Sequence, residues 1–82
     1  MNMEEIKQWI VEWFESHGGG SNVRSHTADN YFDKGWIDSF MFITFIADLE
    51  ERFKITFSNE EFQDRSFATI DGLTAIIEKK HG

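Results

Sequence analysis

The segment Gly35-Trp36-Ile37-Asp38-Ser39-Phe40 combines the features of a reactive hydroxyl at the start of a helix. Asp38 and Ser39 are both good N-cap residues, and an apolar stretch follows them directly. The first backbone N–H groups of a helix have no intrahelical acceptor, and the dipole is positive at that end, so an anion is favoured there. A phosphodiester on the Ser39 hydroxyl would be stabilised in this position.

Catalysis by Ser39 itself would need a base. The chain has three histidines, and nothing in the spacing of His17, His26 or His81 fixes one of them against Ser39. The segment also lacks the Gly-x-Ser-x-Gly pattern of a nucleophile elbow. We therefore expect no catalytic residue and no enzyme activity.

A metal site is not expected either. The chain contains no cysteine, and three dispersed histidines make no zinc pattern. A calcium loop beginning at Asp29 would need a glycine at its sixth place, where Lys34 stands. Its closing glutamate would fall on Phe40. The absence of cysteine also excludes disulfides.

Four helices are expected to position Ser39: three main helices and one short one, in a small all-α bundle. Asn2 can cap the first, and the run Gly18-Gly19-Gly20 stops it. Gly72 inside the last helix costs about 1 kcal/mol relative to alanine. The predicted helices cover Met3–Ser16, Ser39–Phe53, Asn59–Asp64, and the stretch after Thr69 to about Lys80.

A long loop from about His17 to Ile37 joins the first two helices, and we expect it to lack regular structure. Loops of this length inside a compact domain are usually functional or disordered. We expect a mobile glycine-rich first part around Gly18–Ser21 and an ordered second part. The stretch from Phe53 to Phe57 reads as an extended connection. The apolar anchors of the loop are Val23, Tyr31, Phe32, Trp36 and Ile37.

The second helix carries two apolar stripes at 100° per residue, although a solvated helix needs only one. The second stripe shares the flank of Ser39, is edged with acid, and is predicted to be exposed as a surface for partners. The alternative is that Trp36 or Tyr31 covers it. The core stripe is Phe42, Phe45, Ile46, Leu49 and Phe53; the second is Phe40, Ile43 and Ala47, continued by Glu50 and Glu51, with Met41 further round.

The composition of the chain limits the classes of partner that it can bind. The chain has 82 residues, one domain over residues 1–82, and a formal net charge of −7. An acidic surface repels nucleic acid and attracts basic patches on proteins. No apolar run approaches the roughly 18 residues of a membrane span, and the N-terminus is acidic where a secretory signal is basic. We expect a cytoplasmic protein with no membrane contact.

The run KGWIDSFMFITFIADLEERFKITFSNEEFQDRSFATIDGLTAII, residues 34–77, resembles the acyl and peptidyl carrier proteins of the free-standing type. That family has Asp-Ser-Leu at the start of the second helix, a Glu-rich turn ending in Phe, and a Thr-Ile/Val-x-x-Leu opening to the last helix. Here these features stand as Asp38-Ser39-Phe40, as Asp48–Phe53, and as Thr69-Ile70 with Leu73.

The resemblance implies the function. A phosphopantetheinyl transferase would attach 4'-phosphopantetheine from coenzyme A to Ser39, with Asp38 as motif residue and cap. The arm would hold an acyl, aminoacyl or polyketide group as a thioester. An adenylate-forming ligase or acyltransferase would load it, and condensing or modifying enzymes would use it. The monomeric carrier would serve fatty-acid-like, polyketide or nonribosomal peptide biosynthesis.

Two departures from the family pattern affect docking. Phe40 replaces the usual leucine, and the turn Met41–Thr44 lacks the acid that fatty-acid carriers place there. We therefore expect an apolar docking contact through Phe40, Ile43 and Met41, with electrostatics secondary. The sequence around Ser39 is more similar to that of free-standing carriers of specialised pathways than to that of the housekeeping fatty-acid carrier. The competing interpretation is a small helical interaction domain in which an unmodified Ser39 serves as N-cap.

Overall fold

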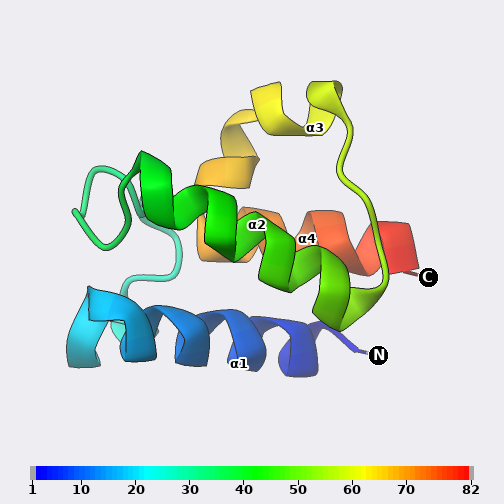
Figure 1. The fold of residues 1–82 in the computed structure, drawn as a ribbon. Coiled ribbons are helices and arrows are strands. Elements are labelled where there is room, and N and C mark those ends of the chain that lie inside the picture. Colours follow the sequence, from blue (N-terminus) through cyan, green and yellow to red (C-terminus); the bar gives the residue numbers. More distant parts are fainter. Residues whose placement is uncertain (1, 82) are drawn as a thin grey trace.

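The computed structural model describes residues 2–81, apart from the side chains of residues 19–21. It is an all-α bundle of three main helices and one short one, as predicted (Figure 1). Within residues 2–81 the extended pairing is limited to an isolated bridge between Asn30 and Thr69. The elements are α1 (Met3–Phe14), a π-helical turn η1 (Glu15–Gly19), a 3-10 helix η2 (Gly20–Ser25), α2 (Ser39–Phe53), α3 (Asn59–Gln63), a 3-10 helix η3 (Arg65–Ala68) and α4 (Ile70–His81).

The first helix begins where the sequence predicts and ends two residues earlier. The Asn2 side-chain oxygen accepts the N–H of Glu5 at 2.9 Å, which confirms the predicted cap. The α-helix ends at Phe14 rather than Ser16, because the next five residues wind as a wider turn. Gly18 then takes a φ of +119°, a left-handed conformation that ends the helix.

The core lies where α1, α2 and α4 meet. In Figure 1, α2 crosses the bundle between α1 and α3, with α4 behind it. Aromatic contacts join the helices; for example, the ring centroids of Trp13 and Phe45 lie 4.6 Å apart. The buried apolar residues are Ile6, Ile10, Val11, Trp13, Phe14, Val23, Tyr31, Trp36, Ile37, Phe45, Leu49, Phe53, Phe57, Phe67, Ile70, Leu73 and Ile77.

The second helix has the predicted bounds, and its core stripe is narrower than predicted. Phe45, Leu49 and Phe53 are buried as expected. Phe42 and Ile46 are only half-buried and pack against the edge of the core. The reason is the neighbouring helix α3, which has five residues and buries none of them, so it covers this edge of α2 incompletely.

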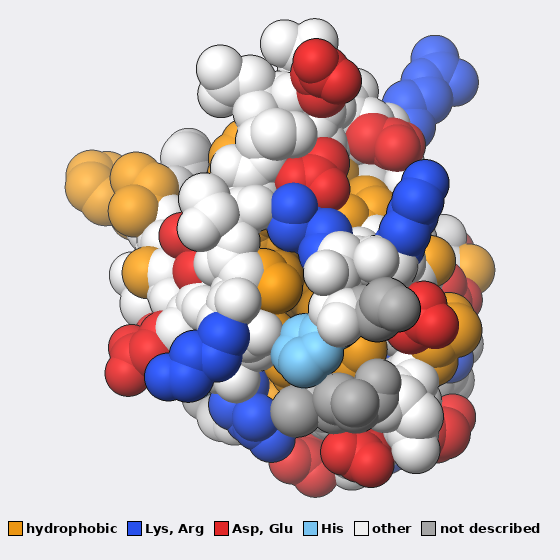
Figure 2. Space-filling view, turned by 90° about the vertical axis from the view of Figure 1, so that its right-hand side faces the viewer, with side chains coloured by type: hydrophobic (Ala, Val, Ile, Leu, Met, Phe, Trp, Pro, Cys, Tyr) orange, Lys and Arg blue, Asp and Glu red, His pale blue; other side chains and the backbone are white. Residues whose placement is uncertain are grey.

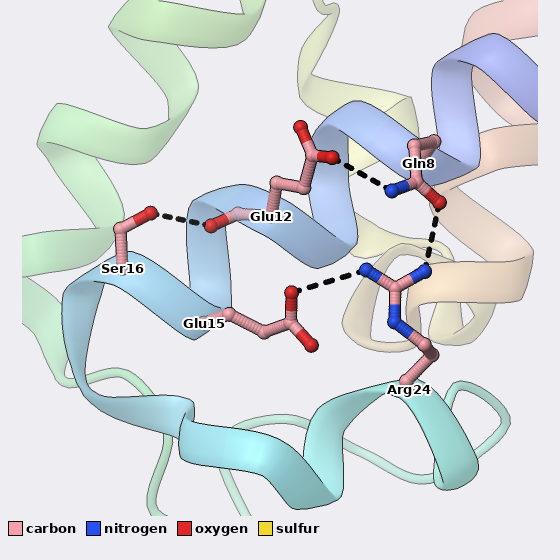
Figure 3. A network of polar contacts seen from close by, with 5 residues as sticks. All are labelled: Gln8, Glu12, Glu15, Ser16 and Arg24. Atoms are coloured by element: carbon pink, nitrogen blue, oxygen red, sulfur yellow. Dashed lines mark hydrogen bonds and ion pairs between the residues drawn. The ribbon is translucent and has the colours of Figure 1, made fainter.

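The long connection between α1 and α2 is more regular than predicted, because residues 20–25 form the 3-10 helix η2. Arg24 of η2 holds it against α1, donating to Gln8 Oε1 at 2.8 Å and to Glu15 Oε1 at 3.1 Å (Figure 3). The predicted mobility of the glycine-rich part is not tested, and the side chains of residues 19–21 lie outside the described part. Val23, Tyr31, Trp36 and Ile37 are buried as predicted; Phe32 is 42% exposed, and its ring packs against those of Tyr31 and Phe42, so it anchors the loop only in part.

The second half of this connection is bonded to the segment before α4. The Tyr31 N–H donates to Ala68 O at 2.9 Å, and its hydroxyl donates to Phe67 O. The Asp71 N–H donates to Thr27 O at 3.0 Å. Burial raises the pKa of the Tyr31 phenol above its ordinary value, so the hydroxyl stays protonated as a donor. The partner segment contains η3, a helix that the sequence did not predict.

The short helix α3 is held by polar contacts. Ser58 and Glu61 form a capping box, and Lys80 Nζ lies 2.9 Å from Glu61 Oε1. Gly72 in α4 lies so close to η3 that a Cβ built on it would lie 2.0 Å from Ser66 O. A close approach of backbones therefore explains this helical glycine. Within residues 2–81, no helix combines the length and apolarity that crossing a membrane requires.

Candidate functional site

Ser39 is the first residue of α2, and its side chain is exposed. The cap is Asp38, whose Oδ1 accepts the N–H of Met41 at 2.9 Å in an extended backbone conformation. Within the described residues, no hydrogen bond engages the Ser39 hydroxyl. Because Asp38 takes the capping role, the Ser39 oxygen is available to a reagent from solution.

The backbone around Ser39 favours a negatively charged group. The N–H of Phe42 donates to Asp38 O at 2.9 Å, so regular helical bonding begins there. Among the residues that the structure describes, the N–H groups of Ser39 and Phe40 have no acceptor. The first turn also carries no acidic side chain. The dipole and the free N–H groups of Ser39 and Phe40 therefore favour a phosphate here, while the Asp38 carboxylate accepts the N–H of Met41.

The residues that precede α2 anchor its start to the core. Trp36 and Ile37 are buried immediately before Asp38. The N–H of Trp36 donates to Tyr31 O at 3.2 Å, and Gly35 makes the turn between them with a φ of +72°. Nothing lies within 4 Å of a Cβ built on Gly35, so the turn is open to solvent. Ser39 is thus an exposed group on a rigid support.

The other serine hydroxyls described by the structure differ from that of Ser39. Each makes a local hydrogen bond within the chain. The side chain of Ser21 lies outside the described part. The engaged hydroxyls are those of Ser16 with Glu12 O at 2.6 Å, Ser25 with Asn22 O at 3.2 Å, Ser58 with Glu61 N at 3.2 Å, and Ser66 with Asp64 Oδ1 at 2.8 Å.

An exposed apolar strip follows Ser39 along the outer face of α2. Phe40 is 85% exposed and Ile43 is 71% exposed, and Ala47 is exposed beyond them. The predicted second stripe is therefore present. The alternative, that Trp36 or Tyr31 covers it, is wrong, because both side chains are buried in the core. We call Phe40, Ile43 and Ala47 the outer strip.

The other predicted docking residues are placed differently. Met41 is half-buried and packs against the core. Glu50 is half-buried, and its Oε2 accepts the N–H of Phe57 at 3.0 Å, so its carboxylate serves the connection to α3. Glu51 is exposed. Asp48 marks the other edge of this face and accepts the indole N–H of Trp13 at 2.9 Å. The outer strip thus has one free acidic neighbour, Glu51, in its last turn.

Among the described residues, no hydrogen-bonded base and no metal centre accompanies Ser39. Two of the histidines bond elsewhere: His17 Nδ1 lies 2.7 Å from Trp13 O, and His26 Nδ1 lies 3.1 Å from Asp29 Oδ2. Over the described residues, no group of three or more His, Asp or Glu side chains is arranged to hold a metal ion.

The face with both chain termini, at the end of the molecule away from Ser39, mixes acidic, basic and apolar side chains (Figure 2).

Comparison with known proteins adds one match. A family model described as a phosphopantetheine attachment site matches residues 21–77. This range runs from η2 to α4 and includes Ser39 and the whole of α2. No curated protein and no solved structure gives a significant match.

Proposed function

The chain belongs to the phosphopantetheine attachment site family, whose members are non-catalytic carriers holding 4'-phosphopantetheine on a serine, and we propose that Ser39 is that serine. The chain is thus a carrier protein rather than an enzyme. The choice among its serines depends on which hydroxyl is accessible and how it is held.

The accessibility of the Ser39 hydroxyl is the observation that carries this proposal. Four other serines lie in the matched range. The hydroxyls of Ser25, Ser58 and Ser66 are engaged in hydrogen bonds that shape turns and caps, and the side chain of Ser21 lies outside the described part. Ser39 is exposed at the N-terminus of a 15-residue helix, with its cap supplied by Asp38. Modification there would disturb no hydrogen bond of the fold.

The surroundings of Ser39 fit the group. In the modification, the Ser39 oxygen would bond to the pantetheine-side phosphorus of coenzyme A while the pyrophosphate bond breaks. The hydroxyl proton would leave to a base of the transferase, and adenosine 3',5'-bisphosphate would depart. The resulting phosphodiester keeps one negative charge, which the free N–H groups and helix dipole stabilise. When attached, the arm supplies a thiol that holds an acyl group as a thioester.

The outer strip is proposed as the docking face for the enzymes that load and use the arm. Exposed apolar patches of this kind commonly mark partner surfaces, and Phe40 lies next to Ser39 in the sequence. Since the first turn of α2 carries no acid, the contact is proposed to be mainly apolar. We further propose that residues 1–82 act as one monomeric carrier domain in a specialised polyketide, fatty-acid-like or nonribosomal peptide pathway.

The first experiment is the intact mass of the protein before and after incubation with coenzyme A and a promiscuous phosphopantetheinyl transferase. We expect the wild type to gain one phosphopantetheine and Ser39→Ala to gain none. Ser58→Ala is the matched control: it should still be loaded, although it loses its capping hydroxyl. A loaded Ser39→Ala would refute the assignment of Ser39.

A folded wild type that gains no mass with an active transferase would refute the carrier role for this chain. The result would favour the interaction-domain interpretation, in which Ser39 is an unmodified residue at a helix start. Folding of each protein is checked by far-UV circular dichroism before the reaction, so that a negative result reports on the site.

A further inference from the structure

The seam between α2 and the α3–η3 segment is filled with aromatic rings. Phe42 lies one helical turn after Ser39 and faces the rings of Phe62 and Phe67 across the seam, and both of these pack against Phe57. The centroids of the contacting pairs are 5.0 to 6.5 Å apart, within the range of favourable aromatic packing. We call Phe42, Phe57, Phe62 and Phe67 the seam cluster.

Polar contacts hold both sides of the seam. The N–H of Phe57 donates to Glu50 Oε2 at 3.0 Å, which fastens the extended connection to α2. Lys80 Nζ lies 2.9 Å from Glu61 Oε1 and 5.9 Å from the centroid of the Phe57 ring, which fastens α3 to α4. Opening the seam would break these contacts as well as separating the rings.

Three surface hollows of the described part of the chain lie away from Ser39 and Phe42. Three pockets have volumes of about 380, 210 and 200 Å³. The first lies between α3 and α4, and four of its five lining residues are charged. The second lies along α1, and the third lies at the ends of α2 and α4. None of the three is an apolar chamber at the attachment site.

We infer that the group carried on the arm stays outside the helix bundle, so that this carrier suits short or polar acyl groups, aminoacyl groups among them, rather than long alkyl chains. The inference rests on the proposed attachment at Ser39. A long alkyl chain avoids water by burial, but forcing one into a packed interior strains the interior. The apolar side chains left exposed near Ser39 and Phe42 are those of the outer strip, Phe32 and Phe62, and an exposed face covers a chain from one side only.

The test uses the absence of cysteine from the chain. Ser39→Cys creates a single thiol, to which an arm of pantetheine length is attached chemically. The arm ends in an acetyl, octanoyl or hexadecanoyl amide. Thermal unfolding and two-dimensional amide NMR spectra are then compared among the three conjugates. Because no transferase is involved, the result does not depend on whether Ser39 is its natural target.

We expect the melting temperatures of the three conjugates to agree within about 1 °C, because a chain left outside adds no buried surface. Amide shifts that depend on chain length should be confined to residues of the outer strip. A melting temperature that rises by about 4 °C or more from acetyl to octanoyl, with shifts at the seam cluster, would overturn the inference.

A second variant makes the packing argument itself testable. Phe62 is 41% exposed, so Phe62→Ala should fold while opening space at the rim of the seam. In this background the octanoyl conjugate should melt about 4 °C or more above the acetyl conjugate. If it does not, the rings are not what excludes the chain, and the inference fails. Failure of wild-type loading in the transferase assay would instead count against the proposed function alone.

Discussion

The two faces of α2 carry similar side chains in opposite environments. Phe45 and Leu49 on the inner face are fully buried, whereas Phe40 and Ile43 on the outer face are 85% and 71% exposed. The inner residues therefore stabilise the fold, because their apolar surface is removed from water. The outer residues keep a full apolar contact available for another molecule, and they keep it beside the exposed hydroxyl of Ser39. Apolar character alone does not decide which role a residue takes.

The difference between the faces comes from what covers them. The inner face lies against α1 through contacts such as Trp13 with Phe45, at 4.6 Å between ring centroids. The aromatic residues of the long connection that were candidates to cover the outer face, Tyr31 and Trp36, are buried in the core instead. The outer strip is exposed because Tyr31 and Trp36 pack in the core and therefore cannot cover it.

The largest expected effect tests the inner face. Leu49→Ala should lower the free energy of unfolding by about 2–5 kcal/mol, because it leaves a cavity in the core. Ile43→Ala is the matched truncation on the outer face and should change stability by less than about 0.5 kcal/mol. Urea unfolding followed by circular dichroism measures both. Equal losses in the two variants would break the comparison, since Ile43 would then belong to the core.

The next effect tests the outer face as a docking surface. Phe40→Ala should lower kcat/KM for transferase loading by about tenfold, or roughly 1.4 kcal/mol, because it removes the most exposed apolar side chain beside Ser39. Its melting temperature should stay close to that of the wild type. Met3→Ala, which truncates a 48% exposed apolar residue on α1, is the control and should load normally. Normal loading of Phe40→Ala would remove Phe40 from the docking surface.

A smaller effect separates the two polar residues at the start of α2. Asp38→Ala should lower the free energy of unfolding by about 0.5–2 kcal/mol, because the N–H of Met41 loses its acceptor. Ser39→Ala should cost less, since its hydroxyl has no partner among the described residues. Chemical unfolding of the two variants gives the order. The reverse order would identify Ser39 as the cap and weaken its assignment as a free hydroxyl.

The smallest effect extends the comparison to α3, which buries no residue fully and is held by polar contacts as well as by the ring of Phe62. The N–H of Ser58, and then Lys80, hold the pKa of Glu61 below its ordinary value of 4.5. A lowered pKa in the folded state stabilises the protein above the ordinary value, and this stability is lost as the pH falls through the folded pKa. Glu61→Gln should therefore flatten the pH dependence of stability below about pH 4.5.

Acid titration of the melting temperature measures this effect. Because Glu61 is half-buried at the surface, solvent screening keeps the change small, at a few tenths of a kcal/mol. Lys80→Met removes the interaction of Glu61 with Lys80 and leaves the hydrogen bond from the Ser58 N–H. The dependence of its melting temperature on pH should therefore lie between those of the wild type and Glu61→Gln. A slope unchanged in both variants would show that the capping box does not anchor α3.

Much of the fold could be predicted because its signals are local. The bounds of α2 follow from Asp38 as a cap and from the end of the apolar pattern at Phe53, and both lie where the sequence places them. The start of α3 at Asn59 also lies where the sequence places it. Where a boundary depends on the backbone of an unusual turn, as after Phe14, the prediction was two residues too long.

The misses depend on neighbours that are distant in the sequence. Phe32 has the character of an anchor, yet it is 42% exposed, and its ring packs at the edge of the core against Phe42 of α2. Phe42 has the spacing of a core residue, yet it lies under a short helix that covers it only in part. Helix periodicity tells which residues share a face, and it does not tell how completely another element covers that face.

The sequence by itself determined the four helices, the caps of α1 and α2, the two apolar stripes of α2 and the position of Ser39 at a helix start, because each depends on residues within a few positions of one another. Only the tertiary structure decided that the outer strip is uncovered, that the seam cluster is closed, and that Gly72 is needed where α4 approaches Ser66 O. These features depend on which surfaces meet, and that is settled only when the whole chain has packed.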